Sequence, residues 1–141
     1  MSTEFADRVE IEELKHRYCY ATDDLDLDAI GDVIADDGRL VVPIYEPMVG
    51  HEEIREYFEW FGEQAYEVRA HNVFNPIVDV GGDTATGEWY YLVIYALPGG
   101  SLEVGHGRYD DEFVRTDDGW KLSFVSATRR ITREVPAEPM A

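Results

Sequence analysis

The sequence predicts an α+β domain in which three N-terminal helices pack on one face of a curved antiparallel sheet. Helical periodicity is confined to the part of the chain before Gly62, and the rest consists of strand-like segments separated by short turns. The chain has 141 residues, of which 45% are hydrophobic, and this composition suits one domain with a packed core. Helices and strands that are segregated along a chain favour this class over alternating βα units, which build parallel sheets.

The helical part contains three amphipathic segments. Apolar residues recur at spacings of three and four over about residues 5–24, and again after Asp26, which can act as an N-cap. A third segment shows the same period and stops at Gly62. The apolar positions are Ile11, Leu14, Tyr18, Ala21 and Leu25, then Leu27, Ile30 and Ile34, and finally Ile54, Tyr57, Phe58 and Phe61. A strand over residues 39–45, interrupted or ended at Pro43, is expected before the third helix.

The second part of the chain predicts a meander of four long strands. Glycine-rich or aspartate-rich turns separate strands at about residues 73–80, 84–97, 102–115 and 120–133. The strand 84–97 is apolar on both faces, since Trp89, Tyr91, Val93 and Tyr95 alternate with Tyr90, Leu92 and Ile94. The helices can cover only one of these faces. We therefore expect a homodimer or homotrimer that associates through the other face.

Charge and composition exclude several classes of function. Twelve basic residues against 30 acidic ones give a net charge of −18, which disfavours nucleic acid and anionic membranes as partners. No apolar run is long enough to span a membrane, and the first residues lack a secretory pattern, so a cytoplasmic location is expected. The single cysteine, Cys19, excludes an internal disulfide. We assign residues 1–134 to one domain and residues 135–141 to a flexible tail.

An ordered set of short motifs resembles a known family. The motifs are Arg17-Tyr18 followed by Asp23, Gly50 at the start of the third helix, His71-Asn72, Asn75-Pro76, Gly82-Asp83-Thr84-Ala85, Gly107-Arg108-Tyr109-Asp110-Asp111 and Arg115-Thr116-Asp117-Asp118-Gly119-Trp120. Over residues 5–133 this set resembles the SnoaL-like branch of the NTF2-like superfamily, and within it the scytalone dehydratase and bile-acid dehydratase group. The resemblance implies a cone-shaped fold with a pocket between the sheet and the helices.

The resemblance also implies candidate catalytic residues. Tyr18 and Asp23 stand where these dehydratases carry a tyrosine and an aspartate at the end of the first helix, and His71 stands near the position of their catalytic histidine. His106 lies on the strand where scytalone dehydratase has another histidine. The sequence departs from these dehydratases at two positions that bear on the substrate and the reaction. Thr22 stands where scytalone dehydratase has a tyrosine, and Val93 stands where the bile-acid enzyme has an aspartate.

The residue types suit acid–base chemistry. Histidine ordinarily titrates near neutral pH, a carboxylate can orient its ring, and a phenol can donate to a developing oxyanion. We therefore expect His71 as general base, Asp23 as its partner and Tyr18 as the donor. Asp23 lies about 140° from Tyr18 on a helical wheel, so it can reach a pocket only if the helix ends there. The expected substrate-binding residues are His106, Asn75, Tyr91, Arg108, Tyr45 and Phe58.

The sequence predicts neither a metal nor another cofactor, because the histidines are scattered and no phosphate-binding loop is present. The leading interpretation is therefore a cofactor-independent lyase or isomerase that acts on a small hydrophobic, oxygen-bearing cyclic substrate. A second interpretation is a non-catalytic ligand-binding or assembly domain, such as the small subunit of a ring-hydroxylating dioxygenase. A third interpretation is an epoxide hydrolase. That branch needs two aspartates and an arginine, and only Arg108 and Asp110 suggest part of such a set.

Overall fold

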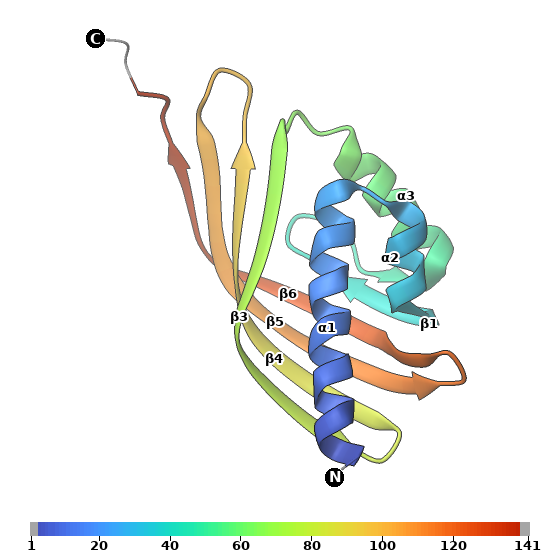
Figure 1. The fold of residues 1–141 in the computed structure, drawn as a ribbon. Coiled ribbons are helices and arrows are strands. Elements are labelled where there is room, and N and C mark those ends of the chain that lie inside the picture. Colours follow the sequence, from blue (N-terminus) through green and yellow to red (C-terminus); the bar gives the residue numbers. More distant parts are fainter. Residues whose placement is uncertain (1–2, 139–141) are drawn as a thin grey trace.

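A computed structural model describes residues 3–138 of the chain. Three helices and six strands follow one another in the order shown in Figure 1. Their bounds are α1 Thr3–Asp24, α2 Leu27–Val33, β1 Ile34–Val41, β2 Met48–Val49, α3 Gly50–Gly62, β3 Val68–Gly81, β4 Thr84–Ala96, β5 Leu102–Thr116 and β6 Gly119–Val135. The three helices lie on one side of a long, strongly curved sheet (Figure 1). None of the described helices is long and apolar enough to cross a membrane.

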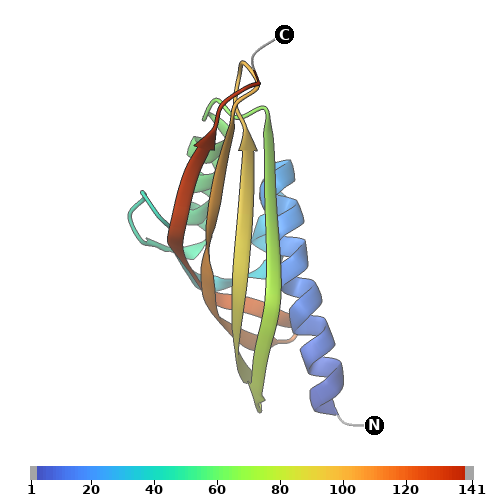
Figure 2. The same ribbon diagram turned by 90° about the vertical axis from the view of Figure 1, so that its left-hand side faces the viewer.

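The strands form one six-stranded sheet in the order β2-β1-β6-β5-β4-β3. The expected antiparallel meander is confirmed for β3 to β6, which lie side by side across the molecule (Figure 2). The sheet as a whole is nevertheless mixed, because β1 pairs in parallel with β6, with Leu40 opposite Val125. β2 extends that edge by an antiparallel pairing with β1. The two short strands thus give α3 a support at the edge of the meander.

The helix α1 ends at the position that the candidate site requires. Leu25 adopts a left-handed backbone with φ of 52°. Its amide donates to the Thr22 carbonyl at 3.2 Å, and the Asp26 amide donates to the Ala21 carbonyl at 3.0 Å. This pair of bonds is a Schellman motif, which satisfies the last carbonyl groups of a helix. Asp23 therefore lies in the last turn of α1. Because the helix ends there, its side chain can extend past the end of the helix toward β3.

The core lies between the helices and the concave face of the sheet. From α1 it contains Ile11, Leu14 and Tyr18, from α3 Ile54, Tyr57, Phe58 and Phe61, and from the strands Trp89, Tyr91, Val93, Tyr109, Phe113, Leu122 and Val125. Asp26 caps α2 as expected, since its carboxylate accepts the Ala29 amide at 3.1 Å. The apolar faces predicted for α1 and α3 are thus the faces that the structure buries. In the second segment Ile30 is buried as predicted, but Ile34 is the first residue of β1 and does not belong to α2.

An irregularity in β3 changes which residues face the core. The β3–β4 register shifts between Phe74 and Ile77, and Asn75 within this bulge has a φ of 56°. Val73 and Val78 are five residues apart, so in a regular strand their side chains would lie on opposite faces. In the structure Val78 is 1% exposed and joins the core, because the extra residue in the bulge inverts the alternation.

The structure describes three residues after the last strand. β6 continues to Val135, one residue past the expected domain boundary, and residues 136–138 have no regular structure. Residues 139–141 of the expected flexible tail lie outside the described residues.

Candidate active site

An aromatic cavity of about 340 Å³ opens between the helices and the concave face of the sheet. Its walls come from the end of α1, the loop after β1, α3 with the segment that follows it, and the inner faces of β3 to β6. The aromatic residues that line it are Tyr18, Tyr57, Phe58, Trp60, Phe61, Tyr66, Tyr91, Tyr95 and Tyr109. Such a wall favours a flat, mostly apolar ligand with a few polar atoms.

His71 forms part of one wall, and Asp23 contacts it from the end of α1. The Nδ1 atom of His71 lies 2.6 Å from Oδ1 of Asp23, and the two side chains are 9% and 21% exposed. Both carboxylate oxygens of Asp23 also accept the backbone amide of His71, each at 3.0 Å. Because an ionised carboxylate only accepts hydrogen bonds, Nδ1 carries the proton and Nε2 has the free lone pair. The last turn of α1 thereby fixes both the ring and the backbone of this position on β3.

The free nitrogen of His71 faces the cavity. Nε2 lies 3.5 Å from the hydroxyl of Tyr95, and the His71 ring meets the ring of Phe61 edge to face at 6.2 Å. On its other side His71, together with Asp23, borders a shallow groove between α1 and β3. The pair therefore separates an enclosed aromatic space from a groove that is open to solvent.

The cavity keeps its tyrosines neutral. Burial raises the pKa of Tyr18 and of Tyr109 well above the usual value for a phenol. Burial also raises the pKa values of Tyr57 and Tyr95. These four hydroxyls are therefore hydrogen-bond donors throughout the neutral and mildly alkaline range.

One arginine extends into the cavity from β6. The Nε atom of Arg129 donates to the Tyr91 hydroxyl at 3.1 Å, and one terminal nitrogen donates to Thr132 Oγ1 at 3.3 Å. Two glycines of β5 leave room for this arrangement. A Cβ atom on Gly105 would overlap the Arg129 guanidinium, and one on Gly107 would lie 2.6 Å from the Tyr91 ring. Within residues 3–138, Arg129 forms no salt bridge, so its charge remains available to a ligand.

A buried ion pair lies beneath the cavity. Lys15 of α1 and Asp111 of β5 are both fully buried, with Nζ 2.9 Å from Oδ2. The Lys15 ammonium also lies 3.4 Å from the centre of the Tyr109 ring, which itself lines the cavity. Burial raises the pKa of Asp111, and the Lys15 charge acts against that shift. This pair connects the helix that carries Tyr18 and Asp23 to the middle of the sheet.

The structure brings together the three predicted catalytic residues. His71 and Tyr18 both line the cavity, and Asp23 contacts His71 from the end of α1. Two predicted binding residues, Tyr91 and Phe58, also line it. Tyr45 lies beside the cavity, where its ring packs against Tyr57 at 4.9 Å and against Trp60 at 5.1 Å.

Three predicted binding residues lie away from the cavity. His106 and Arg108 have the opposite side-chain direction to Tyr109 on β5, so they lie on the outer face of the sheet. There the His106 ring lies 5.3 Å from Tyr90, and Arg108 pairs with Glu88 at 2.8 Å. Asn75 is exposed in the β3 bulge and borders a separate hollow with Arg108. Gly105 and Gly107, which flank His106, therefore make room for Arg129 and Tyr91 on the inner face of the sheet.

Sequence reasoning did not select two of the polar residues in the cavity. Tyr95 shares its strand face with Tyr91, so alternation alone could have indicated it. Arg129 shares the face of Val125 and Ala127, and a charged residue on a buried face was the signal for it. The edge of the cavity also holds Glu103, whose carboxylate accepts the Tyr66 hydroxyl at 3.4 Å.

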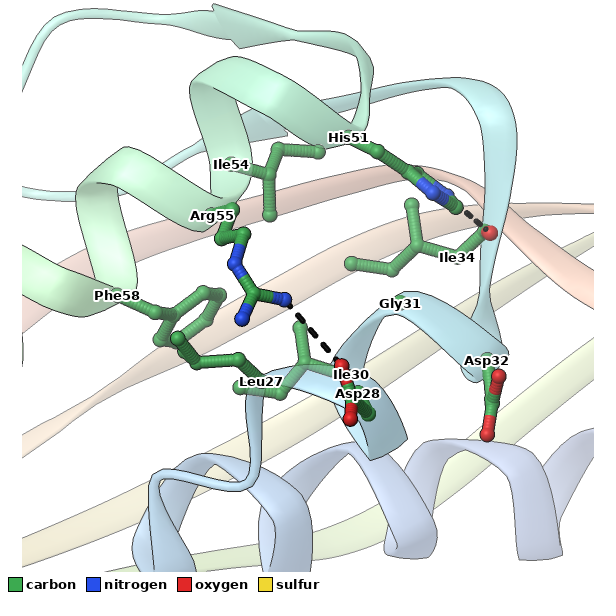
Figure 3. A pocket seen from close by; sticks show the side chains of 10 residues that line it. All are labelled: Leu27, Asp28, Ile30, Gly31, Asp32, Ile34, His51, Ile54, Arg55 and Phe58. Atoms are coloured by element: carbon green, nitrogen blue, oxygen red, sulfur yellow. Dashed lines mark hydrogen bonds and ion pairs between the residues drawn. The ribbon is translucent and has the colours of Figure 1, made fainter.

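A second cavity, of about 330 Å³, lies between α2 and α3 (Figure 3). Its floor is apolar, and two of its polar side chains, Arg55 and His51, already have partners. Arg55 lies 3.3 Å from Asp28 across the opening, and His51 Nε2 lies 2.8 Å from the Ile34 carbonyl (Figure 3). We favour the aromatic cavity over this one as the functional site, because His71, the partner of Asp23, lines the aromatic cavity and does not line the cavity between α2 and α3.

No group of three or more potential metal ligands from His, Cys, Asp and Glu occurs within residues 3–138. The polar groups of the aromatic cavity include one imidazole, several phenols, the Arg129 guanidinium and, at the edge, the Glu103 carboxylate.

The model of the SnoaL-like domain matches residues 3–126, which is most of the chain. The chain belongs to the SnoaL-like domain family. Its architecture, three helices on a curved and unclosed mixed sheet, is the NTF2-like α+β cone. A search of curated proteins by sequence finds no significant match.

Solved structures of this fold include proteins described as enzymes. A candidate aromatic ring hydroxylase from Novosphingobium aromaticivorans is 30% identical, with a TM-score of 0.83 over 93% of this chain and 94% of that one. A candidate scytalone dehydratase from the same species is 18% identical, with a TM-score of 0.83 over 99% and 97%. Hexachlorocyclohexane dehydrochlorinase LinA-type3 from Novosphingobium barchaimii is also 18% identical, with a TM-score of 0.86 over 98% and 96%. The last two similarities concern the fold alone.

Proposed function

We propose that this SnoaL-like domain is a cofactor-independent acid–base lyase of the dehydratase type, or an isomerase. The observation that carries the proposal is the His71–Asp23 pair, whose free nitrogen faces an aromatic cavity. The substrate class that fits is a small, hydrophobic ring compound with oxygen substituents, because the walls are aromatic and the polar groups are few. Neighbours of the same fold that are described as a dehydratase and a dehydrochlorinase support an elimination reaction.

The proposal includes a direction for proton transfer. His71 Nε2 is the acceptor that a substrate in the cavity can reach, and Nδ1 remains bonded to Asp23. When Nε2 takes the proton next to a carbonyl group, the imidazolium that forms is stabilised by the Asp23 carboxylate. The electrons of the broken C–H bond form the new C=C bond, and the C–O bond to the leaving hydroxyl breaks. The imidazolium then returns its proton to that oxygen, so that water leaves and the site is restored.

The cavity also holds groups for the charge that develops on the substrate. The Tyr18 and Tyr95 phenols are neutral donors, and both line the cavity with His71. They can hydrogen-bond to an enolate oxygen, which gains negative charge in the transition state. The Arg129 guanidinium can stabilise an oxygen at the β6 side of the cavity. Asn75, His106 and Arg108 have no role in this proposal, because they lie outside the cavity.

The proposal predicts that His71→Ala and Asp23→Asn each slow turnover by roughly 10²–10⁴, the usual effect of losing general acid–base help. The assay uses a panel of cyclic β-hydroxyketones and follows the absorbance of the conjugated enone that dehydration forms. Asp23→Asn keeps one oxygen for the His71 amide, so folding should survive and can be checked by circular dichroism.

His106→Ala is the matched control, because it removes a histidine from the outer face of the same sheet. It should retain the parent rate. Equal rates for the parent and a folded His71→Ala variant would contradict the proposal. Ligand binding in the cavity without turnover of any member of the panel would favour the non-catalytic alternative, a binding or assembly domain.

A further inference from the structure

The loop between β1 and β2 carries an unusual residue at the edge of the aromatic cavity. Ile44 has a φ of 62°, in the left-handed region, and its side chain is 91% exposed. Turns that need this conformation after a proline normally use Gly or Asn, and a β-branched residue is strained there. Ile44 follows Pro43, and both residues line the cavity.

The neighbours of Ile44 hold it in place at this edge. The Tyr45 ring packs against Tyr57 and Trp60 of α3, at 4.9 and 5.1 Å between ring centres. On the other side Val42 and Pro43 continue the cavity wall. The loop is therefore fixed to the body of the domain, and Ile44 presents an almost uncovered aliphatic side chain beside an aromatic space.

Within the protein almost nothing offsets the strain. A side chain that is 91% exposed makes few packing contacts, so Ile44 gains little from being isoleucine in the unliganded chain. Strained residues persist where they serve a function and cluster at ligand sites. The Ile44 side chain would gain packing contacts if a ligand bound in the cavity had an apolar group that extended out of the opening.

We propose that Ile44 determines specificity by covering an apolar substituent of the substrate at the opening of the aromatic cavity. The proposal rests on the proposed function, because it concerns the same site. It defines the substrate class more closely: a ring that fits among the cavity tyrosines, with an aliphatic or aromatic extension that reaches the opening. Substrates without that extension bind without help from Ile44.

Two probes test the proposal, phenol and 4-hexylphenol, with binding measured by calorimetry. Ile44→Asn removes the apolar surface and places a residue that tolerates the left-handed backbone. It should weaken the binding of 4-hexylphenol by about fivefold or more, since part of one aliphatic side chain is lost from the contact. Phenol binding should change by less than about twofold. The thermal midpoint should rise, because the strain is relieved.

Ile77→Asn is the matched control, since Ile77 is 57% exposed and does not line the cavity. This variant should bind both phenols as the parent does. Equal binding of 4-hexylphenol by the parent and Ile44→Asn would overturn the proposal, and so would an equal loss for both probes. A change of oligomeric state in Ile44→Asn, seen by light scattering, would assign Ile44 to a subunit contact and would also overturn it.

The two proposals fail in different ways. If the parent protein binds neither phenol, the assignment of an aromatic ligand to the cavity is wrong, and the inference about Ile44 falls with it. If the parent binds both phenols and only the Ile44 effect is missing, the cavity keeps its proposed function.

Discussion

Four buried phenols surround the space where a ligand would bind, and burial raises the pKa of each. They are Tyr18, Tyr57, Tyr95 and Tyr109. In the unfolded chain tyrosines lose their protons near pH 10, whereas these four keep them in the folded protein. The folded state then binds more protons than the unfolded state, and under this condition the free energy of unfolding falls as pH rises.

We therefore predict a steep loss of stability as the pH rises through about 10. The slope should approach about 1.4 kcal/mol per pH unit for each tyrosine that is ionised only in the unfolded chain. Urea unfolding at pH 8, 9.5 and 10.5 measures it. The variant Tyr95→Phe should show a shallower slope than the parent, because one such phenol is missing. A free energy of unfolding that is constant over this range would contradict the prediction.

The residues of the candidate site differ in how well the sequence predicts them. The resemblance to the SnoaL-like family selects His71, Asp23 and Tyr18, and the structure places Nδ1 of His71 2.6 Å from Oδ1 of Asp23. Periodicity alone puts Asp23 off the apolar face of its helix, and the contact depends on where the helix ends. Asn75 could not be placed, since a β-bulge leaves no clear signal in a single sequence. The prediction that His106 lines the cavity is wrong, because its side chain lies on the outer face of the sheet. Alternation separates the two faces of a strand but does not say which of them the helices cover.

At the level of elements, the Lys15–Asp111 pair attaches α1 to β5. Removing one partner leaves a buried charge without compensation, which usually costs about 3–5 kcal/mol, whereas replacing both by apolar residues is often nearly neutral. We therefore predict that Lys15→Met destabilises the fold by about 3 kcal/mol or more. The double variant Lys15→Met/Asp111→Leu should recover most of this loss.

A double-mutant cycle in urea measures this coupling. The exposed pair Arg17–Glu13, 3.9 Å apart on the other side of the same helix, is the control. Its single variants should change the free energy of unfolding by less than about 1 kcal/mol. If Lys15→Met is no worse than Arg17→Met, the buried pair does not hold α1 in place.

The sequence predicts most of the helices and strands well. It predicts the order of the strands in the sheet only in part. The four strands of the meander are sequential neighbours, so short turns determine their order. The position of β1 beside β6 depends instead on contacts between distant segments, such as Leu40 with Val125. Local periodicity does not contain that information, so the parallel pairing of β1 with β6 could not be read from the sequence in addition to the antiparallel meander.

At the scale of the whole molecule, the helices cover only the concave side of the sheet, and strands form the other side (Figure 2). The outer face of β4, which lies between β3 and β5, carries Tyr90, which is 39% exposed, with Leu92 and Ile94 half-buried beside it. On the neighbouring strands the same face includes Val104 and Ile131, and Ile131 is 53% exposed. We propose that this face joins copies of the chain into a homodimer or homotrimer.

Light scattering at micromolar concentration should therefore give more than the monomer mass of 16.1 kDa. Leu92→Glu should dissociate the assembly, because it places a charge in the middle of the apolar surface. Val9→Glu makes the same change at a residue of α1 that is 47% exposed, and it should leave the mass unchanged. A parent protein that is monomeric at this concentration would refute the proposal.

The parallel pairing of β1 with β6 has a consequence for the order of folding. Leu40 pairs with Val125, so the edge of the sheet beneath α3 cannot form until β6 has left the ribosome. Closing so long a loop is entropically costly, and folds dominated by distant contacts fold slowly. During synthesis α1 and α3 would expose their apolar faces without a sheet to cover them. The aromatic cavity, whose wall includes β6, is therefore among the last parts of the molecule to form, and until then its aromatic side chains are prone to aggregation.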